Sequence, residues 1–162
     1  MVDLARRNFF KAKSIHTKSA MRLPYVIDEN TFMEKCTQCE DCITACPEHI
    51  IVKGDGGFPE IDFSRGECTF CNKCVDVCEA PLFKKTDAEP AFDLHIEIKS
   101  NCLALNQVVC RSCEDSCETE AISFKYLQSS IPQPQILLDS CNGCGACISM
   151  CPQSSIELSP KT

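Results

Sequence analysis

Sixteen cysteines at regular spacing constrain this 162-residue chain more than any other feature of its sequence. Three of the four quartets have the spacing C-x2-C-x2-C-x3-C, whereas the third has seven residues between its first two cysteines. The quartets are Cys36, Cys39, Cys42 and Cys46; Cys68, Cys71, Cys74 and Cys78; Cys102, Cys110, Cys113 and Cys117; and Cys141, Cys144, Cys147 and Cys151. Similar intervals separate successive quartets, and such a repeat marks tandem structural units.

Three chemistries use cysteines in this number, and the spacing favours one of them. Disulfides form in oxidising compartments, yet no apolar region of a cleavable export sequence follows the N-terminus, and cysteines so close in sequence rarely reach disulfide geometry. Structural zinc usually takes two separate C-x2-C pairs for each ion. Three thiolates from one short loop suit an iron–sulfur cubane, and the fourth cysteine, followed by proline at Pro47 and Pro152, ligates the other cluster of a pair.

Residues 24–159 resemble bacterial ferredoxins that carry two [4Fe-4S] clusters, here in duplicate. The sequence C-N-G-C-G-A-C-I-S-M-C-P in the fourth quartet matches that pattern best, and its Gly143 and Gly145 permit a tight loop. The second quartet has its proline three residues late, at Pro81, and Glu118 follows the third quartet in place of a proline. The third quartet also departs from the pattern by an extension of five residues between Cys102 and Cys110. The resemblance implies an α+β fold of two tandem ferredoxin-like modules, with small antiparallel hairpins and short helices around four [4Fe-4S] clusters.

Two pairings of the quartets are compatible with the spacing. We expect the sequential pairing, in which the first quartet pairs with the second and the third with the fourth, because hairpin signals lie where a two-cluster ferredoxin has the connection between its motifs. Its four sites are Cys36, Cys39, Cys42 and Cys78; Cys68, Cys71, Cys74 and Cys46; Cys102, Cys110, Cys113 and Cys151; and Cys141, Cys144, Cys147 and Cys117. In the nested alternative, the first quartet pairs with the fourth and the second with the third, so Cys46 shares a cluster with Cys141.

The segments between the cysteines predict short hairpins. The turn Gly54-Asp55-Gly56-Gly57 separates apolar runs at 50–53 and 58–62, which is a hairpin signal. Further pairs are expected between 121–124 and 135–138, between 25–27 and 82–83, and between 96–98 and 156–158, with short helices beginning near each fourth cysteine. The predicted organisation is a basic, flexible arm over 1–22, a first module over 23–85, a linker over 86–93 and a second module over 94–159.

Charge and composition exclude several classes of protein. The chain has a formal charge of −7 and lacks tryptophan. Because residues 1–22 are basic, the rest of the chain is strongly acidic. Nucleic-acid binding depends on neutralising phosphates, so this acidic part is a poor ligand for nucleic acid. No apolar run approaches the length of about 18 residues that a membrane-spanning helix requires. No nucleophile–base pair or nucleotide-binding motif is present, and little chain remains for a substrate pocket, so we expect a protein that is not an enzyme. The acidic pairs Glu40-Asp41 and Glu114-Asp115 favour solubility or electrostatic tuning of a cluster.

The basic arm contains a motif similar to a twin-arginine export signal. Arg6 and Arg7 are followed by two phenylalanines and Lys11, but lysines then occupy the place of the apolar stretch, and such a segment enters a membrane at high cost. We therefore expect an arm that does not direct export. It is either a solubilising tail or a docking element for a partner, with Arg6 and Arg7 as the docking residues.

Four cluster motifs combined with a twin-arginine-like start resemble the ferredoxin-type proteins of the periplasmic nitrate reductase system, the NapF family. That resemblance implies a cytoplasmic protein that binds the nitrate reductase catalytic subunit before its export and assists its maturation. The other hypothesis is an electron carrier or an electron-transfer subunit of a respiratory oxidoreductase.

Overall fold

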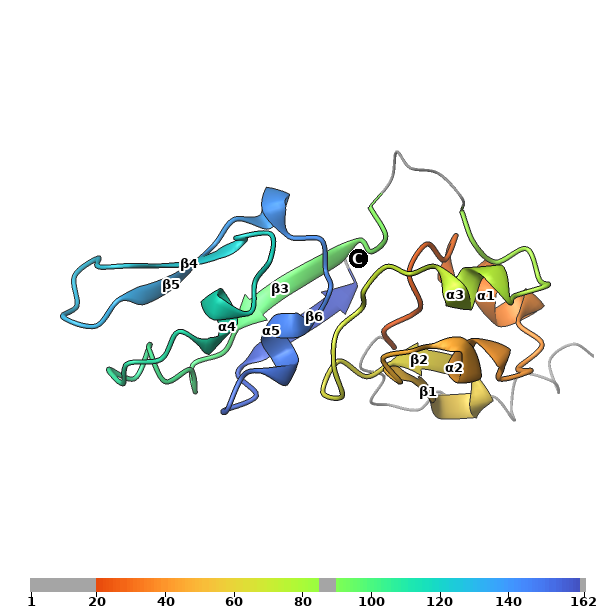
Figure 1. Cartoon of the computed structure of the whole chain (residues 1–162), viewed down its shortest axis with the longest axis horizontal. Helices are drawn as coiled ribbons and strands as arrows, with labels where there is room; N and C mark the ends of the chain where they lie inside the picture. The colour runs from red at the N-terminus through yellow and green to blue at the C-terminus, as the bar shows by residue number, and fades with distance from the viewer. Residues whose placement is uncertain (1–19, 85–89, 161–162) are drawn as a thin grey trace, which may run out of the picture.

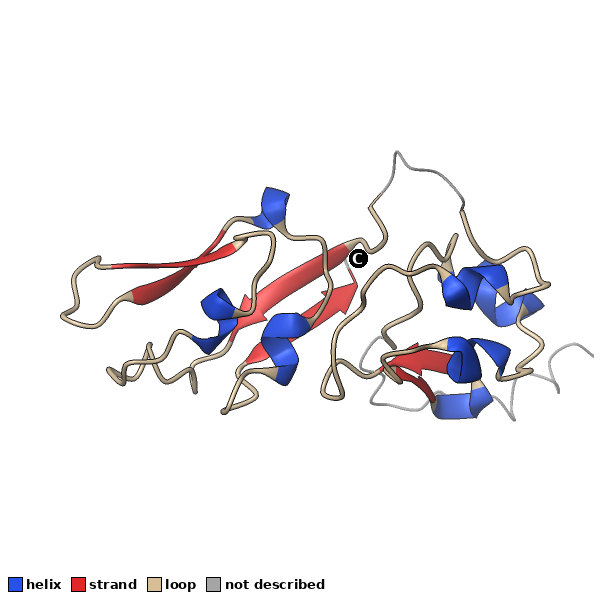
Figure 2. Cartoon of the chain, in the orientation of Figure 1, coloured by secondary structure: helices blue, strands red, loops and turns tan. Residues whose placement is uncertain are grey.

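The computed structural model describes residues 20–84 and 90–160, which form two modules along the long axis of the molecule (Figure 1). Both modules consist of short helices and short antiparallel strand pairs, joined by loops that carry most of the cysteines (Figure 2). None of the helices within these residues is long and apolar enough to cross a membrane.

The first module contains one two-stranded sheet and three short helices. In it, β1 (Ile51–Lys53) pairs with β2 (Pro59–Ile61) across the 3-10 turn η1 (Asp55–Gly57). The chain reverses there because Gly56 and Gly57 have φ values of 68° and 85°, which glycine adopts without steric cost. This confirms the hairpin predicted from the glycine-rich turn. Its helices are α1 (Glu29–Lys35), α2 (Asp41–Ala45) and α3 (Lys73–Asp76).

Helix α1 has a conventional start that the sequence analysis did not identify. Asp28 precedes it and accepts hydrogen bonds from the backbone N–H of Thr31, at 2.9 Å, and from the Thr31 hydroxyl, at 2.7 Å. These hydrogen bonds from Thr31 lower the pKa of the Asp28 carboxyl. An aspartate directly before a helix is a recognised capping signal, and here it precedes the helix that buries Phe32.

The second module contains two strand pairs and two helices. The pair β3 (Leu94–Ile98) and β6 (Ile156–Pro160) joins its two ends, and β4 (Ile122–Lys125) pairs with β5 (Gln133–Ile136). The expected pairing of 96–98 with 156–158 is confirmed, with Ile96 opposite Leu158. The remaining elements are α4 (Ser112–Asp115), the 3-10 turn η2 (Leu138–Ser140) and α5 (Ala146–Ser149).

Two expected strands differ from those in the structure. The strand predicted at 135–138 lies at 133–136 and includes Pro134, which a two-stranded sheet tolerates because both of its strands are edges. Leu137 and Leu138 are instead exposed and lead into η2. The pairing of 25–27 with 82–83 is reduced to a bridge between Val26 and Phe83.

The residues next to the predicted arm and linker are anchored. Residues 1–19 and 85–89 lie outside the described part of the chain, so the flexibility of most of the arm stays a prediction. Arg22, placed at the end of the arm, instead forms an ion pair with Glu29 at 2.6 Å, donates to the carbonyl of Pro59 and covers the ring of Phe32 at 4.8 Å. Residues 90–93 belong to the predicted linker, but the carbonyl of Ala91 accepts a hydrogen bond from the N–H of Tyr25 at 2.8 Å.

The hydrophobic core is divided between two clusters of buried side chains, and both include cysteines. Leu23, Ile50, Ile51, Ile61, Phe63 and Val75 surround Cys46 and Cys74 in the first. Ile96, Ile122 and Ile156 surround Cys113 and Cys147 in the second. The apolar side chains therefore pack around thiols, so the sites and the core are the same part of each module.

Candidate iron–sulfur sites

The loops of the regular quartets turn at equivalent positions. In each, the residues directly before and after the second cysteine have left-handed backbone, with φ between 53° and 84°. These residues are Gln38 and Glu40, Phe70 and Asn72, and Gly143 and Gly145. The two turns curl a short loop so that its three thiols line one cavity, which is the arrangement that a cubane requires.

Within the described residues, four of the five short helices each carry the third cysteine of a quartet. Cys42, Cys74, Cys113 and Cys147 lie in α2, α3, α4 and α5, and each of these four helices ends one or two residues before the fourth cysteine. The expectation that helices begin near the fourth cysteine is therefore wrong. The left-handed residue after the second cysteine redirects the chain in the three regular quartets, so the helix starts there and delivers the fourth cysteine to the next element.

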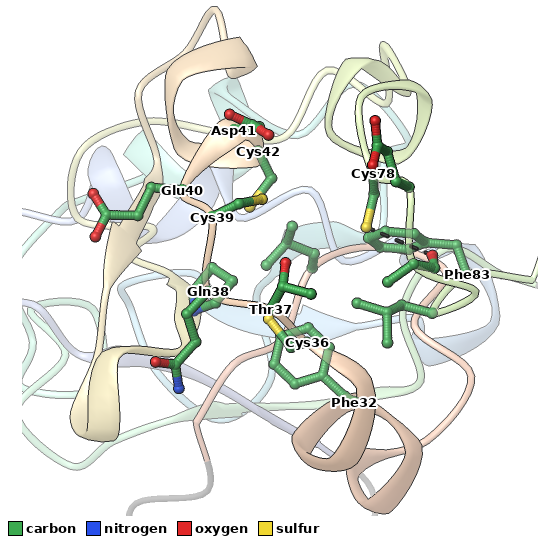
Figure 3. A pocket seen from close by; sticks show the side chains of 15 residues that line it. Phe32, Cys36, Thr37, Gln38, Cys39, Glu40, Asp41, Cys42, Cys78 and Phe83 are labelled. Carbon is green, nitrogen blue, oxygen red and sulfur yellow. Dashed lines mark hydrogen bonds between the residues drawn. The ribbon is translucent and has the colours of Figure 1, made fainter.

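The first cavity brings together cysteines from two quartets. Cys36, Cys39 and Cys42 line one side of a cavity of about 310 Å³, and Cys78 lines the other. Figure 3 shows these side chains around a common space, with the rings of Phe32 and Phe83 beside it. Thiols from one loop thus meet a fourth thiol that is distant in sequence.

Three more cavities repeat this arrangement. The second is lined by Cys46, Cys68, Cys71 and Cys74; the third by Cys102, Cys110, Cys113 and Cys151; and the fourth by Cys117, Cys141, Cys144 and Cys147. The structure groups the cysteines as the sequential pairing predicts, with Cys46 and Cys141 in different modules. Over residues 20–84 and 90–160, no three His, Cys, Asp or Glu side chains are placed to hold a single metal ion; the thiols surround a space instead.

The extension in the third quartet forms a loop of its own. The N–H of Val108 donates to the carbonyl of Leu103 at 2.9 Å, and the Asn106 amide donates to the carbonyls of Ser100 and Cys102. Ala104 inside the loop is fully buried, and Gln133 from β5 donates to its carbonyl at 2.8 Å. Leu103 lines the third cavity, whereas residues 104–109 do not, so Cys102 occupies the position of a first cysteine despite its spacing.

Burial raises the pKa of seven of these thiols. Desolvation, followed by neighbouring thiols, raises the pKa of Cys42 to about 11 and those of Cys74, Cys113 and Cys147 to about 12. Iron binds the thiolate, so cluster binding at these sites displaces protons.

Cys151 differs because Ser155 donates to its sulfur. Burial alone would raise its pKa, but the Ser155 hydroxyl, 3.1 Å from Sγ, and the Ser155 N–H, at 3.3 Å, lower it. Ser155 is only 1% exposed. Sequence reasoning missed this residue, although a serine four positions after a ligand cysteine is a recognisable source of such a hydrogen bond.

One glutamate of each acidic pair, Glu40-Asp41 and Glu114-Asp115, forms an ion pair with a nearby basic side chain. Glu40 pairs with Lys53, whereas Glu114 pairs with Arg111 and accepts the backbone N–H of Phe124 at 3.1 Å, which connects α4 to β4. Glu114 thus has a structural role, and tuning of a cluster by these pairs stays a prediction. The other predicted site residues, Arg6 and Arg7, lie outside the described residues.

Comparisons with known proteins agree with this architecture. A family model described as a 4Fe-4S dicluster domain matches residues 35–81 and 108–155, and two such domains account for four [4Fe-4S] clusters. Cys102 lies outside the matched ranges, so its place in the third cavity comes from the structure alone.

Relatives of similar length share much of the sequence. Proteins named "Ferredoxin-type protein NapF" from Haemophilus influenzae and Escherichia coli are each 41% identical to this chain, over 96% of the chain and 94% of the relative. One component of an ion-translocating oxidoreductase complex from Methanosarcina acetivorans is 32% identical over 76% of this chain, but the match spans only 46% of that protein.

Proposed function

This chain belongs to the NapF family of ferredoxin-type iron–sulfur proteins, and we propose that each of its four cavities binds one [4Fe-4S] cluster through the four cysteines that line it. The donor set fits, because every cavity offers three thiols from one loop and a fourth from the paired quartet. A bound cluster supplies one-electron redox chemistry. The protein positions the clusters, shields them from solvent and adjusts their potentials, and we propose no substrate chemistry of its own.

The proposed role is that of a cytoplasmic accessory protein for the catalytic subunit of periplasmic nitrate reductase, acting on that subunit before its export. Similarity to NapF proteins over nearly the whole chain is the observation that carries this proposal. The protein delivers electrons to the immature subunit or assists its iron–sulfur site. The alternative, an electron-transfer subunit of a respiratory oxidoreductase, is favoured by the partial match to a component of an oxidoreductase complex.

An anaerobic pull-down from cell extract distinguishes the two roles. An accessory protein should bind the unexported precursor of the catalytic subunit and release the mature enzyme, with iron and acid-labile sulfide matching four clusters. Stoichiometric copurification with a membrane oxidoreductase, and no binding of the precursor, would contradict the accessory role.

The arm provides a specific test of partner binding. Deleting residues 1–19 should leave the cluster content unchanged, because every cavity is lined by later residues; the deletion must spare Arg22, which packs on Phe32. If Arg6 and Arg7 dock by bidentate contacts, replacing both by lysine should weaken partner binding about tenfold or more. Binding is measured at several salt concentrations, since generic attraction would survive the lysine replacement and be screened by salt. Unchanged binding after the deletion would identify a solubilising tail.

Ser155 should adjust the potential of the third site. Hydrogen bonds to a ligand sulfur stabilise the more negative, reduced cluster, so Ser155→Ala should lower the reduction potential of that cluster by up to about 40 mV, equivalent to about 1 kcal/mol for one electron. A redox titration followed by electron paramagnetic resonance measures the shift. Ser154→Ala is the matched control, because Ser154 is exposed next to the same turn. A raised or unchanged potential in Ser155→Ala would contradict this tuning.

A further inference from the structure

The two modules meet through residues that line one cavity in each. The backbone N–H of Cys68 donates to the carbonyl of Cys144 at 2.8 Å. Cys68 lines the second cavity, in the first module, and Cys144 lines the fourth, in the second module. In Figure 1, the loop between β2 and α3 extends from the first module toward α5. Two cavity-lining cysteines thus connect the modules directly.

Aromatic packing holds this junction in place. Phe92, which precedes β3, lies with its ring centroid 6.0 Å from that of Phe63 and 6.1 Å from that of Phe70. Edge-to-face and tilted pairs at such distances are favourable beyond their buried area. Phe63 is 5% exposed, so the ring is part of a closed interface.

Gly145 shows how closely the modules approach. Its φ of 84° is not by itself a reason for glycine, because Glu40 and Asn72 also have left-handed backbone at the equivalent positions. A Cβ on Gly145, however, would overlap the ring of Phe63. The glycine is required by the contact between the modules.

Thiols also approach one another between the cavities of each module. Helix α2, which carries Cys42 of the first cavity, contacts α3, which carries Cys74 of the second, and Cys42 packs against the hydrophobic cluster that contains Cys74. In the second module α4 contacts α5, and Cys113 of the third cavity lies in the same hydrophobic cluster as Cys147 of the fourth. Each module therefore places its two cavities side by side.

We infer that the four sites form one unbranched row, in the order first, second, fourth, third, and that electrons cross between the modules at Cys68 and Cys144. This inference rests on the proposed cluster binding. Cys68 and Cys144 would hold the second and fourth clusters on either side of this contact, and one electron would pass from the reduced to the oxidised cluster, in either direction, with no bond or proton transferred. A one-electron donor protein supplies it at one end of the row, and a one-electron acceptor removes it at the other.

Paired cysteine variants test the order. Cys39→Ala with Cys110→Ala removes the outer sites and keeps the central pair; Cys71→Ala with Cys144→Ala removes the central pair and keeps the outer sites. Both should retain half of the iron and sulfide. After reduction with dithionite, the first variant should show spin–spin interaction between its two clusters by electron paramagnetic resonance, and the second should show isolated signals. If the variant that keeps the central pair holds half of the iron but shows isolated signals, the proposed order of the sites is wrong, although the proposed cluster binding still stands.

A second test uses the fully loaded protein in case the paired variants do not hold half of the clusters. Phe92→Ala removes the ring that packs on Phe63 and Phe70 and replaces no cysteine. The matched control is Phe58→Ala, because Phe58 contacts Phe32 away from the junction. After a pulse supplying less than one electron per protein, the spread of reduction between modules should slow at least tenfold in Phe92→Ala and remain unchanged in Phe58→Ala. An unchanged rate in Phe92→Ala, with four clusters present, would overturn the proposal.

Discussion

Removing the clusters should abolish the cooperative unfolding transition of this protein. Cysteines form part of the hydrophobic core of both modules. The secondary structure consists of α-helices of four to seven residues and sheets of two strands. Isolated helices and hairpins of this size are marginal in water. Metal binding in such a fold is also folding free energy, so the metal-free chain should lack stable tertiary structure.

Anaerobic treatment with an oxidant and a chelator provides the measurement. Circular dichroism and thermal melting are compared before and after iron removal, with a thiol reductant added once the oxidant has been removed, to prevent disulfide formation. Reconstitution with iron and sulfide is the control for irreversible damage and should restore the transition. A cooperative transition in metal-free protein at the holo temperature would show that the apolar core suffices.

The fourth cysteine of each quartet lines the cavity of the paired quartet, so alanine substitutions should remove clusters in a specific pattern. Because Cys78 lines the first cavity and Cys46 lines the second, alanine at either position should remove about a quarter of the iron in a four-cluster protein. Two substitutions at one site should remove no more iron than either alone, whereas the iron losses from substitutions at different sites should add. Thus Cys46→Ala with Cys71→Ala should lose one cluster, and Cys46→Ala with Cys39→Ala should lose two.

The same cycle distinguishes the two pairings. In the nested alternative Cys46 shares a cluster with Cys141, so Cys46→Ala combined with Cys144→Ala would remove only one cluster. The grouping of cysteines in the structure requires that this variant lose two. Iron and sulfide content, together with the intensity of the reduced signal, measure the loss, and loss of a single cluster would be incompatible with the cavities described.

Several features of the site follow from the sequence because they depend on local geometry. Three thiols within seven residues must face one cavity when the loop turns twice, so the spacing alone predicts a cluster ligand set. The same holds for the β1–β2 hairpin, whose glycines supply the φ values of the turn. In both cases the decisive interactions join residues close in sequence.

The tertiary structure decided what depends on contacts between distant residues. Spacing allows Cys46 two alternative sites, and only packing places it with Cys68, Cys71 and Cys74. The position of Cys102 depends on the closure of its extension against Gln133. The sequence identifies Gly145 only as a turn residue, but glycine is required there because a Cβ would overlap the ring of Phe63 in the other module. The sequence thus determined which chemistry the chain can hold, since ligand spacing is a property of short loops; the fold determined which thiols share a cavity and how the cavities adjoin, since these depend on packing between elements far apart in the chain.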